Sequence, residues 1–388
     1  MHPRTPVVVG IGLSDYPRAP HLSALGHVMQ ASHRAAKDAG IKLSEIDGFM
    51  STGAQGNLYD DACTAAEFLG LRPTLIDGSM TGGSAAECVM PNAMEAIRSG
   101  RCDTILIAYG SDLASNKALN LSTGTLRNGK LAGTSMWDSL AGQSIIANYA
   151  LIAKRHMHEF GTSLDHLTEV ARSARLHAAR NPKATLRDPL TDEQVEASRF
   201  LADPLRAIDC CMVNDGGGAL ILTTWERARD LPQRPVVPLA AAMSMPFWSI
   251  GEMEDLTTTG AAIAGPRALA QAGLTTDDID MLQIYDSFTI TPLVMMEGLG
   301  FCGRGEAGPF VMDGKLRPDG TLPLNTDGGG LANSHPGMRG IFLMIEAVDQ
   351  LRGTAGERQI ANARTALACG SGGLMSAIGV VIFTNEAG

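Results

Sequence analysis

Two stretches of this chain, 233 residues apart, carry the same local pattern. Ala39 to Asp47 reads A-G-I-K-L-S-E-I-D, and Ala272 to Asp280 reads A-G-L-T-T-D-D-I-D. Each is typical of a helix stop followed by a polar turn and a new strand, and a repeat at a fixed offset indicates an internal duplication. A nine-residue match in so small an alphabet can also arise by chance. The order of the other elements must therefore support the duplication.

Both halves of the chain alternate short strands with helices, which favours an α/β fold in which helices cover the sheets. In the first half, apolar runs and helical spacing predict strands at Pro6–Leu13, Ile46–Met50, Thr74–Asp77 and Thr104–Tyr109, and helices at Leu25–Ala39, Asp60–Leu69 and Thr81–Arg98. In the second half, they predict strands at Val236–Ala242, Ile279–Tyr285, Ala363–Cys369 and Ala377–Phe383, and helices at Thr259–Ala272, Phe288–Leu299 and Ile341–Leu351.

The pattern divides the chain into a first half, residues 1–231, and a second half, residues 232–388. A long excursion interrupts the first half at about residues 111–206, beginning with the polar, Gly-rich stretch Asn120 to Gly133. Two helices are predicted within it, and a segment of this length is typical of a lid or a substrate wall. The chain then returns to the first sheet through a turn and a strand within Ala207 to Thr224.

Composition excludes several classes of function. The net charge of −10 argues against a nucleic-acid surface, and the absence of an 18-residue apolar run argues against a membrane span, so we expect a cytoplasmic protein. Its 388 residues, 45% of them hydrophobic, suffice for a large core. The seven cysteines form neither a C-x-x-C pair nor a zinc spacing, so we expect reduced thiols and no metal.

The stretch Leu75 to Gly83 predicts a strand, a tight turn and a helix start, with Ser79 on the turn. A side chain there is presented rather than buried, and N–H groups at the helix start favour an anion beside it. An ordinary turn with a capping serine is the alternative.

Three further Gly-punctuated stretches stand at the ends of predicted elements. They offer a phenol at Tyr285, an imidazole at His335 and a thiol at Cys369, beside the hydroxyl of Ser79. In a duplicated α/β fold, equivalent strand ends can meet at one place, where open sheets bind ligands. These groups together form an acid/base and oxyanion set.

A basic stretch free of acidic residues lies inside the excursion. In an acidic protein, it is a candidate clamp for a phosphorylated ligand, and a solvated helix face is the alternative. Its members are Arg172, Arg175, Arg180, Lys183 and Arg187.

Several of these stretches resemble the thiolase superfamily, in particular the branch similar to sterol-carrier-protein-x thiolases. The run Asn325 to Gly340, N-T-D-G-G-G-L-A-N-S-H-P-G-M-R-G, is similar to the family's N-T-x-G-G…G-H-P-x-G-x-x-G segment. Ile208 to Gly218, Leu299 to Gly305 and Cys369 to Gly373 are similar too. The resemblance covers essentially the whole chain. It implies a duplicated five-layered αβαβα fold, an acyl-CoA thioester as substrate with no permanently bound cofactor, and a homodimer or a dimer of dimers.

Two residues depart from the family pattern. Ser79 stands where the family has its nucleophilic cysteine, and a hydroxyl is a far poorer nucleophile than a thiolate. Tyr285 replaces the histidine of the H-D-C-F motif, and a phenol is a poor base at neutral pH. His335 matches the histidine that activates the nucleophile, and Cys369 matches the second, acid/base cysteine.

The leading hypothesis is a thiolase-like acyltransferase. In it, His335 deprotonates Ser79, which takes the acyl group, Cys369 or Tyr285 handles the α-proton, and the N–H groups of Ser79 and Ser371 hold the oxyanion.

Three alternatives remain open. One is a retro-aldol cleavage of a β-hydroxyacyl-CoA without an acyl-enzyme, as in the thiolase-like aldolases of sterol side-chain breakdown. The resemblance to those aldolases implies a small partner protein with an OB-fold and a zinc ribbon. Another is a non-catalytic acyl-CoA or lipid-binding scaffold. The third is a serine hydrolase, because Ser79, Asp286 and His335 come in the α/β-hydrolase order.

Overall fold

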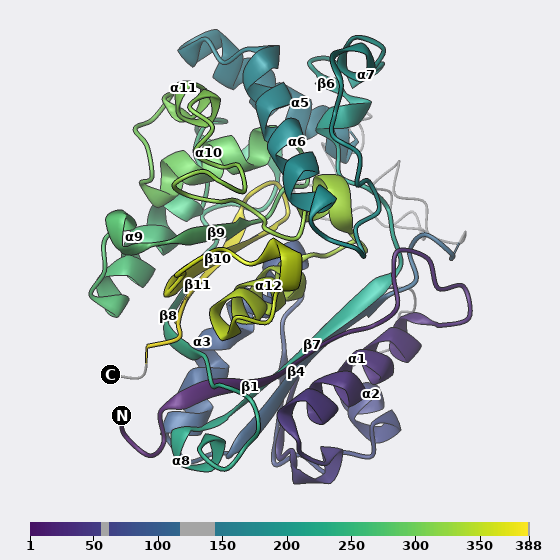
Figure 1. Ribbon diagram of the computed structural model, residues 1–388, viewed down its shortest axis with the longest axis vertical. Helices are drawn as coiled ribbons and strands as arrows, with labels where there is room; N and C mark the ends of the chain where they lie inside the picture. Colours follow the sequence, from purple (N-terminus) through teal and green to yellow (C-terminus); the bar gives the residue numbers. More distant parts are fainter. Residues whose placement is uncertain (56–61, 117–143, 387–388) are drawn as a thin grey trace.

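The chain folds around two sheets, seen in the computed structural model, which describes residues 1–55, 62–116 and 144–386 (Figure 1). The first sheet has the strand order β1-β7-β4-β2-β3. Its strands are β1 (Pro6–Leu13), β2 (Gly48–Gln55), β3 (Leu75–Gly78), β4 (Thr104–Ser111) and β7 (Gly216–Thr224). β7 pairs antiparallel with both β1 and β4, whereas β4, β2 and β3 run parallel.

The second sheet repeats this arrangement with one strand fewer, in the order β8-β11-β10-β9. Its strands are β8 (Val237–Ser244), β9 (Met281–Ile284), β10 (Thr365–Gly372) and β11 (Ala377–Thr384). The sequence of antiparallel, antiparallel and parallel pairings is the same as in the first sheet. An isolated parallel bridge between Leu282 and Leu324 lies where a fifth strand would pair.

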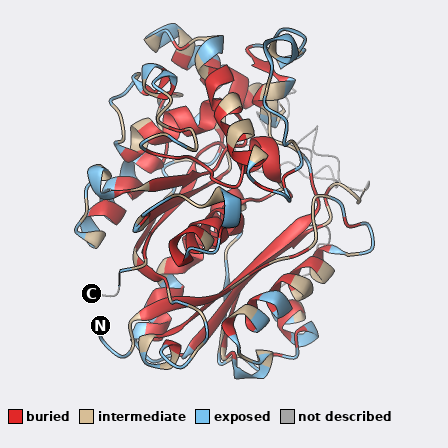
Figure 2. Ribbon diagram, viewed as in Figure 1, coloured by how far each residue is buried: buried red, intermediate tan, exposed pale blue. Residues whose placement is uncertain are grey.

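Helices fill the space between the sheets and cover both outer faces. The helices α1 (Ala24–Ala39) and α2 (Ala62–Phe68) cover the first sheet, α3 (Ala85–Arg98) and α12 (Gly340–Arg352) lie between the sheets, and α9 (Ala261–Ala272) and α10 (Ile290–Leu299) lie beyond the second. Three apolar clusters fill the interfaces between these layers. The expected five-layered αβαβα fold is therefore confirmed, and Figure 2 shows α12 and both sheets mainly buried.

The repeated nine-residue pattern has the same structure in both halves. α1 ends at Gly40 with φ 71°, and α9 ends at Gly273 with φ 68°, the left-handed conformation that glycine adopts at a helix stop. A one-turn 3₁₀-helix follows in each case, Leu43–Glu45 and Thr276–Asp278, and leads to β2 or β9. The second residue of the repeat is therefore glycine in both halves, because in both it must adopt the left-handed conformation.

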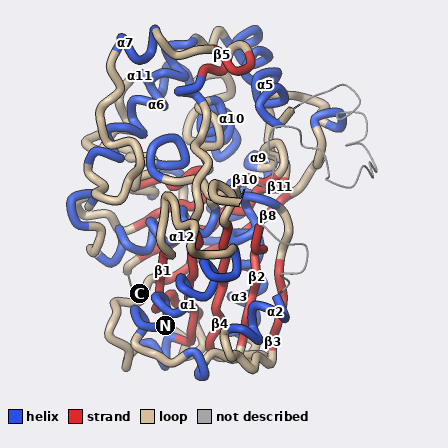
Figure 3. The backbone as a smooth tube through the Cα atoms, turned by 90° about the vertical axis from the view of Figure 1, so that its right-hand side faces the viewer, coloured by secondary structure: helices blue, strands red, loops and turns tan. Residues whose placement is uncertain are grey.

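The described part of the excursion lies between β4 and β7 and packs against the second half of the chain. It contains α5 (Ile145–Phe160), α6 (Leu164–Ala179), α7 (Asp192–Glu196), β5 (Phe200–Ala202) and β6 (Leu205–Arg206). Buried side chains of α5 and α6 share one apolar cluster with α9 and α10, and Figure 3 shows α5 and α6 at the α10 end of the molecule. The predicted Gly-rich stretch 120–133 lies outside the described residues.

Most predicted elements are present, with shifted ends. The helix expected from Thr81 begins as a 3₁₀ turn, Gly82–Ser84, and becomes α-helical only at Ala85. Sequence reasoning missed α8 (Trp225–Ala228), α11 (Ala307–Met312) and a π-helical turn at Gly329–Asn333. In the described part of the chain, no helix has the length and apolarity that a membrane crossing requires.

Candidate active site

The centre of the site is a hydrogen bond between Tyr285 and His335, whose Oη and Nε2 atoms are 2.8 Å apart. Tyr285 directly follows β9, and its N–H donates to the carbonyl of Cys369 on β10 over 2.9 Å. The Asn325 side chain brackets the strand end, accepting from the N–H of Ile284 and donating to its carbonyl. The phenol is thus held by backbone contacts on both sides.

His335 is fixed by a reciprocal pair of contacts with Asn214, in the turn before β7. The His335 N–H donates to Asn214 Oδ1 over 2.9 Å, and the Asn214 N–H donates to the His335 carbonyl over 3.3 Å. Within the described residues, the Asn214 amide nitrogen Nδ2 has no acceptor, so it is available to a ligand. The first and second halves of the chain therefore both contribute to the site.

The protonation states of the pair follow from burial. Desolvation of the imidazole, reinforced by the nearby Arg339 charge, lowers the pKa of His335 to about 4. Burial, with the proximity of Cys211 and Tyr149, raises the pKa of Tyr285 well above its ordinary value. At neutral pH, the pair is therefore a neutral phenol beside a neutral imidazole that can accept its proton.

The Tyr285 ring packs against the helix start that carries Gly83. A Cβ on Gly83 would lie 2.4 Å from the Tyr285 ring and 2.3 Å from the Ser371 carbonyl oxygen, so only glycine fits there. The Gly-rich turn predicted as an anion cradle therefore serves to admit the phenol ring.

Ser79 lies on the predicted turn after β3 and is partly exposed. Its hydroxyl is 3.1 Å from Thr81 Oγ1 and accepts the Thr81 N–H over 3.3 Å. Its own N–H donates to the Ser51 carbonyl over 3.2 Å, so that N–H is already committed. Among the described residues, no hydrogen bond joins Ser79 to Tyr285, His335 or Cys369.

Cys369 lies on β10, where its carbonyl accepts the Tyr285 N–H, and its side chain is fully buried. Burial, together with Glu87 and Cys88 nearby, raises the pKa of the Cys369 thiol well above its ordinary value. A thiol in this environment stays protonated, and it is a poor base.

The hydrolase triad is not assembled. The Asp286 carboxylate accepts the N–H groups of Gly330 and Leu331 over 2.7 and 3.2 Å and lies 3.6 Å from Nε of Arg339. It makes no hydrogen bond to His335 within the described residues. The order Ser79, Asp286, His335 along the chain thus does not correspond to a charge-relay geometry, and that alternative is wrong for this site.

The predicted basic clamp divides into residues with different environments. Arg172 pairs with Asp192, and Arg175 donates to the Asp188 carbonyl over 3.0 Å. The remaining members, Arg180, Lys183 and Arg187, are exposed. The set therefore does not form one cluster on one helix face.

Arg175 lines a cavity of about 260 Å³ whose other walls are mostly apolar. Two of its lining residues are tied to the segments that carry the reacting pair: the Cys211 N–H donates to the Ser287 carbonyl over 2.9 Å, and the Met212 N–H donates to the Gly330 carbonyl over 3.1 Å. The further lining residues are Ala171, Leu186, Leu190, Ala207, Ile208, Cys210 and Leu331.

Ser371 is buried at the end of β10, close to the Tyr149 phenol. Tyr149 comes from α5, and its ring packs 4.4 Å from that of Phe288. The excursion thus contributes Tyr149 to the edge of the site. In the described part of the chain, no group of three His, Cys, Asp or Glu side chains is arranged to hold a metal ion.

Three residues of the site were missed by sequence reasoning: Asn214, Arg339 and Glu87. Asn214 and Arg339 lie within the runs that resemble the family, but at positions that the family motif leaves unspecified. Glu87 is a single polar residue on a predicted helix, which by itself indicates no site. A signal existed for Arg339, because an arginine directly before a helix of nearly unbroken apolar residues is unusual.

Comparison with known proteins identifies the family of this chain. Residues 242–385 match the family described as Thiolase C-terminal domain-like. The chain is 34% identical over 361 residues to the 17-hydroxy-3-oxo-4-pregnene-20-carboxyl-CoA lyase of Mycobacterium tuberculosis, with 90% of this chain and 92% of the relative covered. It is 37% identical over 250 residues to the acetyl-CoA acetyltransferase of Methanothermobacter thermautotrophicus, with 64% and 65% covered.

Among solved structures, the Ltp2-ChsH2(DUF35) aldolase superposes with a TM-score of 0.88 and 29% identity, covering 100% of this chain and 99% of that one. Relatives that span almost the whole chain thus include a lyase and an aldolase, and the acetyltransferase spans about two thirds of it.

Proposed function

This chain belongs to the thiolase superfamily, and from that premise we propose that it cleaves a carbon–carbon bond in a β-hydroxyacyl-CoA by a retro-aldol reaction. The observation that carries the proposal is the 2.8 Å Tyr285–His335 hydrogen bond between two neutral groups. A similar lyase and a similar aldolase over nearly the full length support it.

In the reaction, one proton leaves the substrate β-hydroxyl and later returns to the substrate at its α-carbon. The substrate β-hydroxyl gives its proton to Tyr285 Oη as the Tyr285 proton passes to His335 Nε2. The Cα–Cβ bond then breaks, the β-carbon becomes a ketone or aldehyde, and the electron pair forms the thioester enolate. The same proton returns through Tyr285 to the enolate α-carbon, which gives the shortened acyl-CoA without oxidant or net water.

The enolate oxygen needs a donor that is not already used. Asn214 Nδ2 supplies it in this proposal. Two hydrogen bonds hold Asn214 against the His335 backbone, and Nδ2 has no acceptor among the described residues. The Ser79 N–H, expected for this role from the sequence, is bonded to Ser51 instead.

The CoA thioester enters this proposal through the cavity lined by Arg175 and Cys211. Its apolar walls suit a pantetheine or acyl arm, and Arg175 supplies a positive charge within the cavity wall. The exposed Arg180, Lys183 and Arg187 lie in the same basic stretch and are available to the nucleotide phosphates.

The test is incubation with β-hydroxyacyl-CoA esters, with and without a small OB-fold and zinc-ribbon partner protein, with mass-spectrometric detection of the released carbonyl product. Such a partner is proposed from the two-component aldolase that this chain resembles. Tight acyl-CoA binding by calorimetry without any carbonyl product would contradict the aldolase and favour a non-catalytic scaffold.

Replacement of Ser79 by alanine separates cleavage from acyl transfer. We expect Ser79→Ala to keep its turnover within about threefold, because the hydrogen bonds of the Ser79 hydroxyl within the described residues all stay in its own turn. Intact-protein mass spectrometry should show no acyl adduct on the wild-type chain. A loss of about 10²-fold or more, with an adduct on Ser79, would support the acyltransferase instead.

We also propose that the chain forms a homodimer along β3. Among the described strands this one is the edge of the first sheet, and its outer N–H and C=O groups pair with none of them. Three large apolar side chains near this edge are exposed: Phe68 on α2, Ile76 on β3 and Met80 after it, at 59, 42 and 74%. A second copy placed edge to edge would cover them.

The variant Ile76→Lys/Met80→Lys should shift the chain from dimer to monomer in light scattering after size-exclusion chromatography, since two charges would be buried without partners. Phe200→Lys removes a similarly exposed apolar side chain on β5 and should leave the mass unchanged. A dimer in both variants would show that the contact lies elsewhere.

A further inference from the structure

Arg339 is a completely buried arginine that lies between the segments carrying Tyr285 and His335. Its Nη1 donates to the carbonyl of Ser334, the residue before His335, over 2.7 Å. Its Nη2 is 2.6 Å from both carboxylate oxygens of Asp327, and its Nε is 3.6 Å from Asp286, the residue after Tyr285. One guanidinium thus bridges the two reacting segments.

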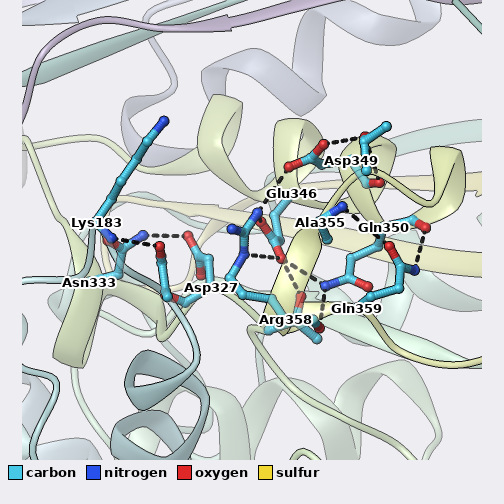
Figure 4. A network of polar contacts seen from close by, with 12 residues as sticks. Lys183, Asp327, Asn333, Glu346, Asp349, Gln350, Ala355, Arg358 and Gln359 are labelled. Atoms are coloured by element: carbon cyan, nitrogen blue, oxygen red, sulfur yellow. Dashed lines mark hydrogen bonds and ion pairs between the residues drawn. The ribbon is translucent and has the colours of Figure 1, made fainter.

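The two carboxylates also hold the Gly-rich loop between them. Asp327 accepts the N–H of Gly329 over 2.9 Å and the amide of Asn333 over 2.8 Å, and Figure 4 shows Asn333 pointing toward Asp327. Asp286 accepts the N–H groups of Gly330 and Leu331. The loop that leads to His335 is therefore fixed at both ends by the partners of Arg339.

Holding a loop with a buried arginine is energetically unfavourable compared with holding it by apolar packing. Desolvation of an unpaired charge costs several kcal/mol, and apolar side chains of similar volume often replace buried ion pairs with no loss of stability. A cost of this kind is expected where the charge affects chemistry, as it does beside an acid/base pair.

The charge of Arg339 acts directly on His335. The Tyr285 phenol is hydrogen-bonded to the imidazole, and the Asn214 amide holds the backbone N–H of His335. The charge that acts on the imidazole is the Arg339 cation, and a Cβ on Gly330 would lie close to both the imidazole and the Asp286 carboxylate. Burial and the Arg339 charge both lower the pKa of His335, whereas Asp286 and Asp327 are themselves engaged by Arg339 and by backbone N–H groups. The cation therefore disfavours imidazolium.

We propose that Arg339 is a positioning residue for the retro-aldol reaction. Through Asp286 and Asp327 it fixes the His335 loop against the end of β9, which maintains the Tyr285–His335 hydrogen bond, and its charge keeps the imidazole unprotonated until the reaction begins. This inference rests on the proposed function of that pair.

The test compares the wild type with Arg339→Lys and with Arg339→Met/Asp327→Asn, which removes the Arg339–Asp327 ion pair and leaves Asp286 with the N–H groups of Gly330 and Leu331. The matched control is Arg352→Met/Asp38→Asn. It removes another Arg–Asp pair, 2.7 Å apart, from the far end of α12. Two readouts are used: the NMR titration of His335, assigned with His335→Asn, and the pH profile of kcat with KM for the β-hydroxyacyl-CoA.

In Arg339→Met/Asp327→Asn, the His335 titration should move up by about one pH unit or more, and the acidic limb of kcat should follow it. We expect kcat to fall by about 10–100-fold with KM changed less than about threefold. Arg339→Lys keeps the charge and should shift the titration less, while losing the simultaneous contacts with Asp327 and the Ser334 carbonyl and part of kcat. The control should change neither readout.

An unchanged His335 titration in the double variant, or an equal change in the control, would overturn the proposal. If the wild type shows no cleavage activity, the proposed function fails, but the titration of His335 still decides whether Arg339 governs this imidazole.

Discussion

Replacing Tyr285 with phenylalanine should lower kcat for carbonyl release by about 10²–10⁴-fold and leave the affinity for acyl-CoA within about threefold. The variant removes only the oxygen that lies 2.8 Å from His335 Nε2. The ring itself, which packs against Gly83, is retained. Without that oxygen, the substrate hydroxyl proton has no route to the imidazole. Product formation by coupled assay and CoA-ester binding by calorimetry would measure the two effects.

A double-mutant cycle with His335→Asn gives this prediction its control. Because Tyr285 and His335 act on one proton, Tyr285→Phe/His335→Asn should be about as slow as either single variant. Additive losses would show that the two residues act on separate steps. Full activity in Tyr285→Phe would contradict the proposed mechanism outright.

Glu87 should make the wild-type protein less stable as pH rises. Its carboxyl is fully buried on α3, and neither oxygen has a side-chain or long-range hydrogen-bond partner among the described residues. The carboxyl fits only because Gly340 and Gly370 have no side chains, since a Cβ on either would lie 2.2 Å from Glu87 Oε2. Burial raises the pKa of Glu87 to about 8 from the model-compound value of 4.5, with only its own backbone N–H opposing the shift.

The sign of the effect follows from linkage. Between pH 4.5 and 8, the folded chain keeps the Glu87 proton that the unfolded chain has lost, so the free energy of unfolding falls as pH rises through this range. The fall for this one group is at most about 4–5 kcal/mol, complete above pH 8. For a chain of this length, that corresponds to roughly 5 °C in Tm.

Glu87→Gln and Glu87→Met should remove this pH dependence, so that their Tm relative to wild type rises between pH 5 and 9. Glu95→Gln is the matched control, because it makes the same change at an exposed position of the same helix. Parallel Tm curves for the wild type and both Glu87 variants across this range would contradict the prediction.

The sequence predicted much of the fold because its signals are local. Strands and helices follow from the period of apolar residues, and Gly40 and Gly273 end their helices for a reason contained in the backbone itself. The π-helical turn at Gly329–Asn333 escaped prediction, since its shape depends on Asp286 and Asp327 from outside the segment. The predicted ends of elements differ from the observed ends where tertiary contacts replace local ones, as at Gly82 to Ser84, where a 3₁₀ turn replaces the start of the predicted helix.

The sequence by itself determined the α/β architecture, the repeated helix stop, and Ser79, Tyr285, His335 and Cys369 as candidates. Only the tertiary structure decided which of them act together. Tyr285 and His335, 50 residues apart, share a hydrogen bond, while Ser79 is turned to Thr81 and Cys369 is buried beside Glu87. The reason is physical: hydrogen-bond partners and pKa values depend on what surrounds a side chain in space, and spacing along the chain carries neither.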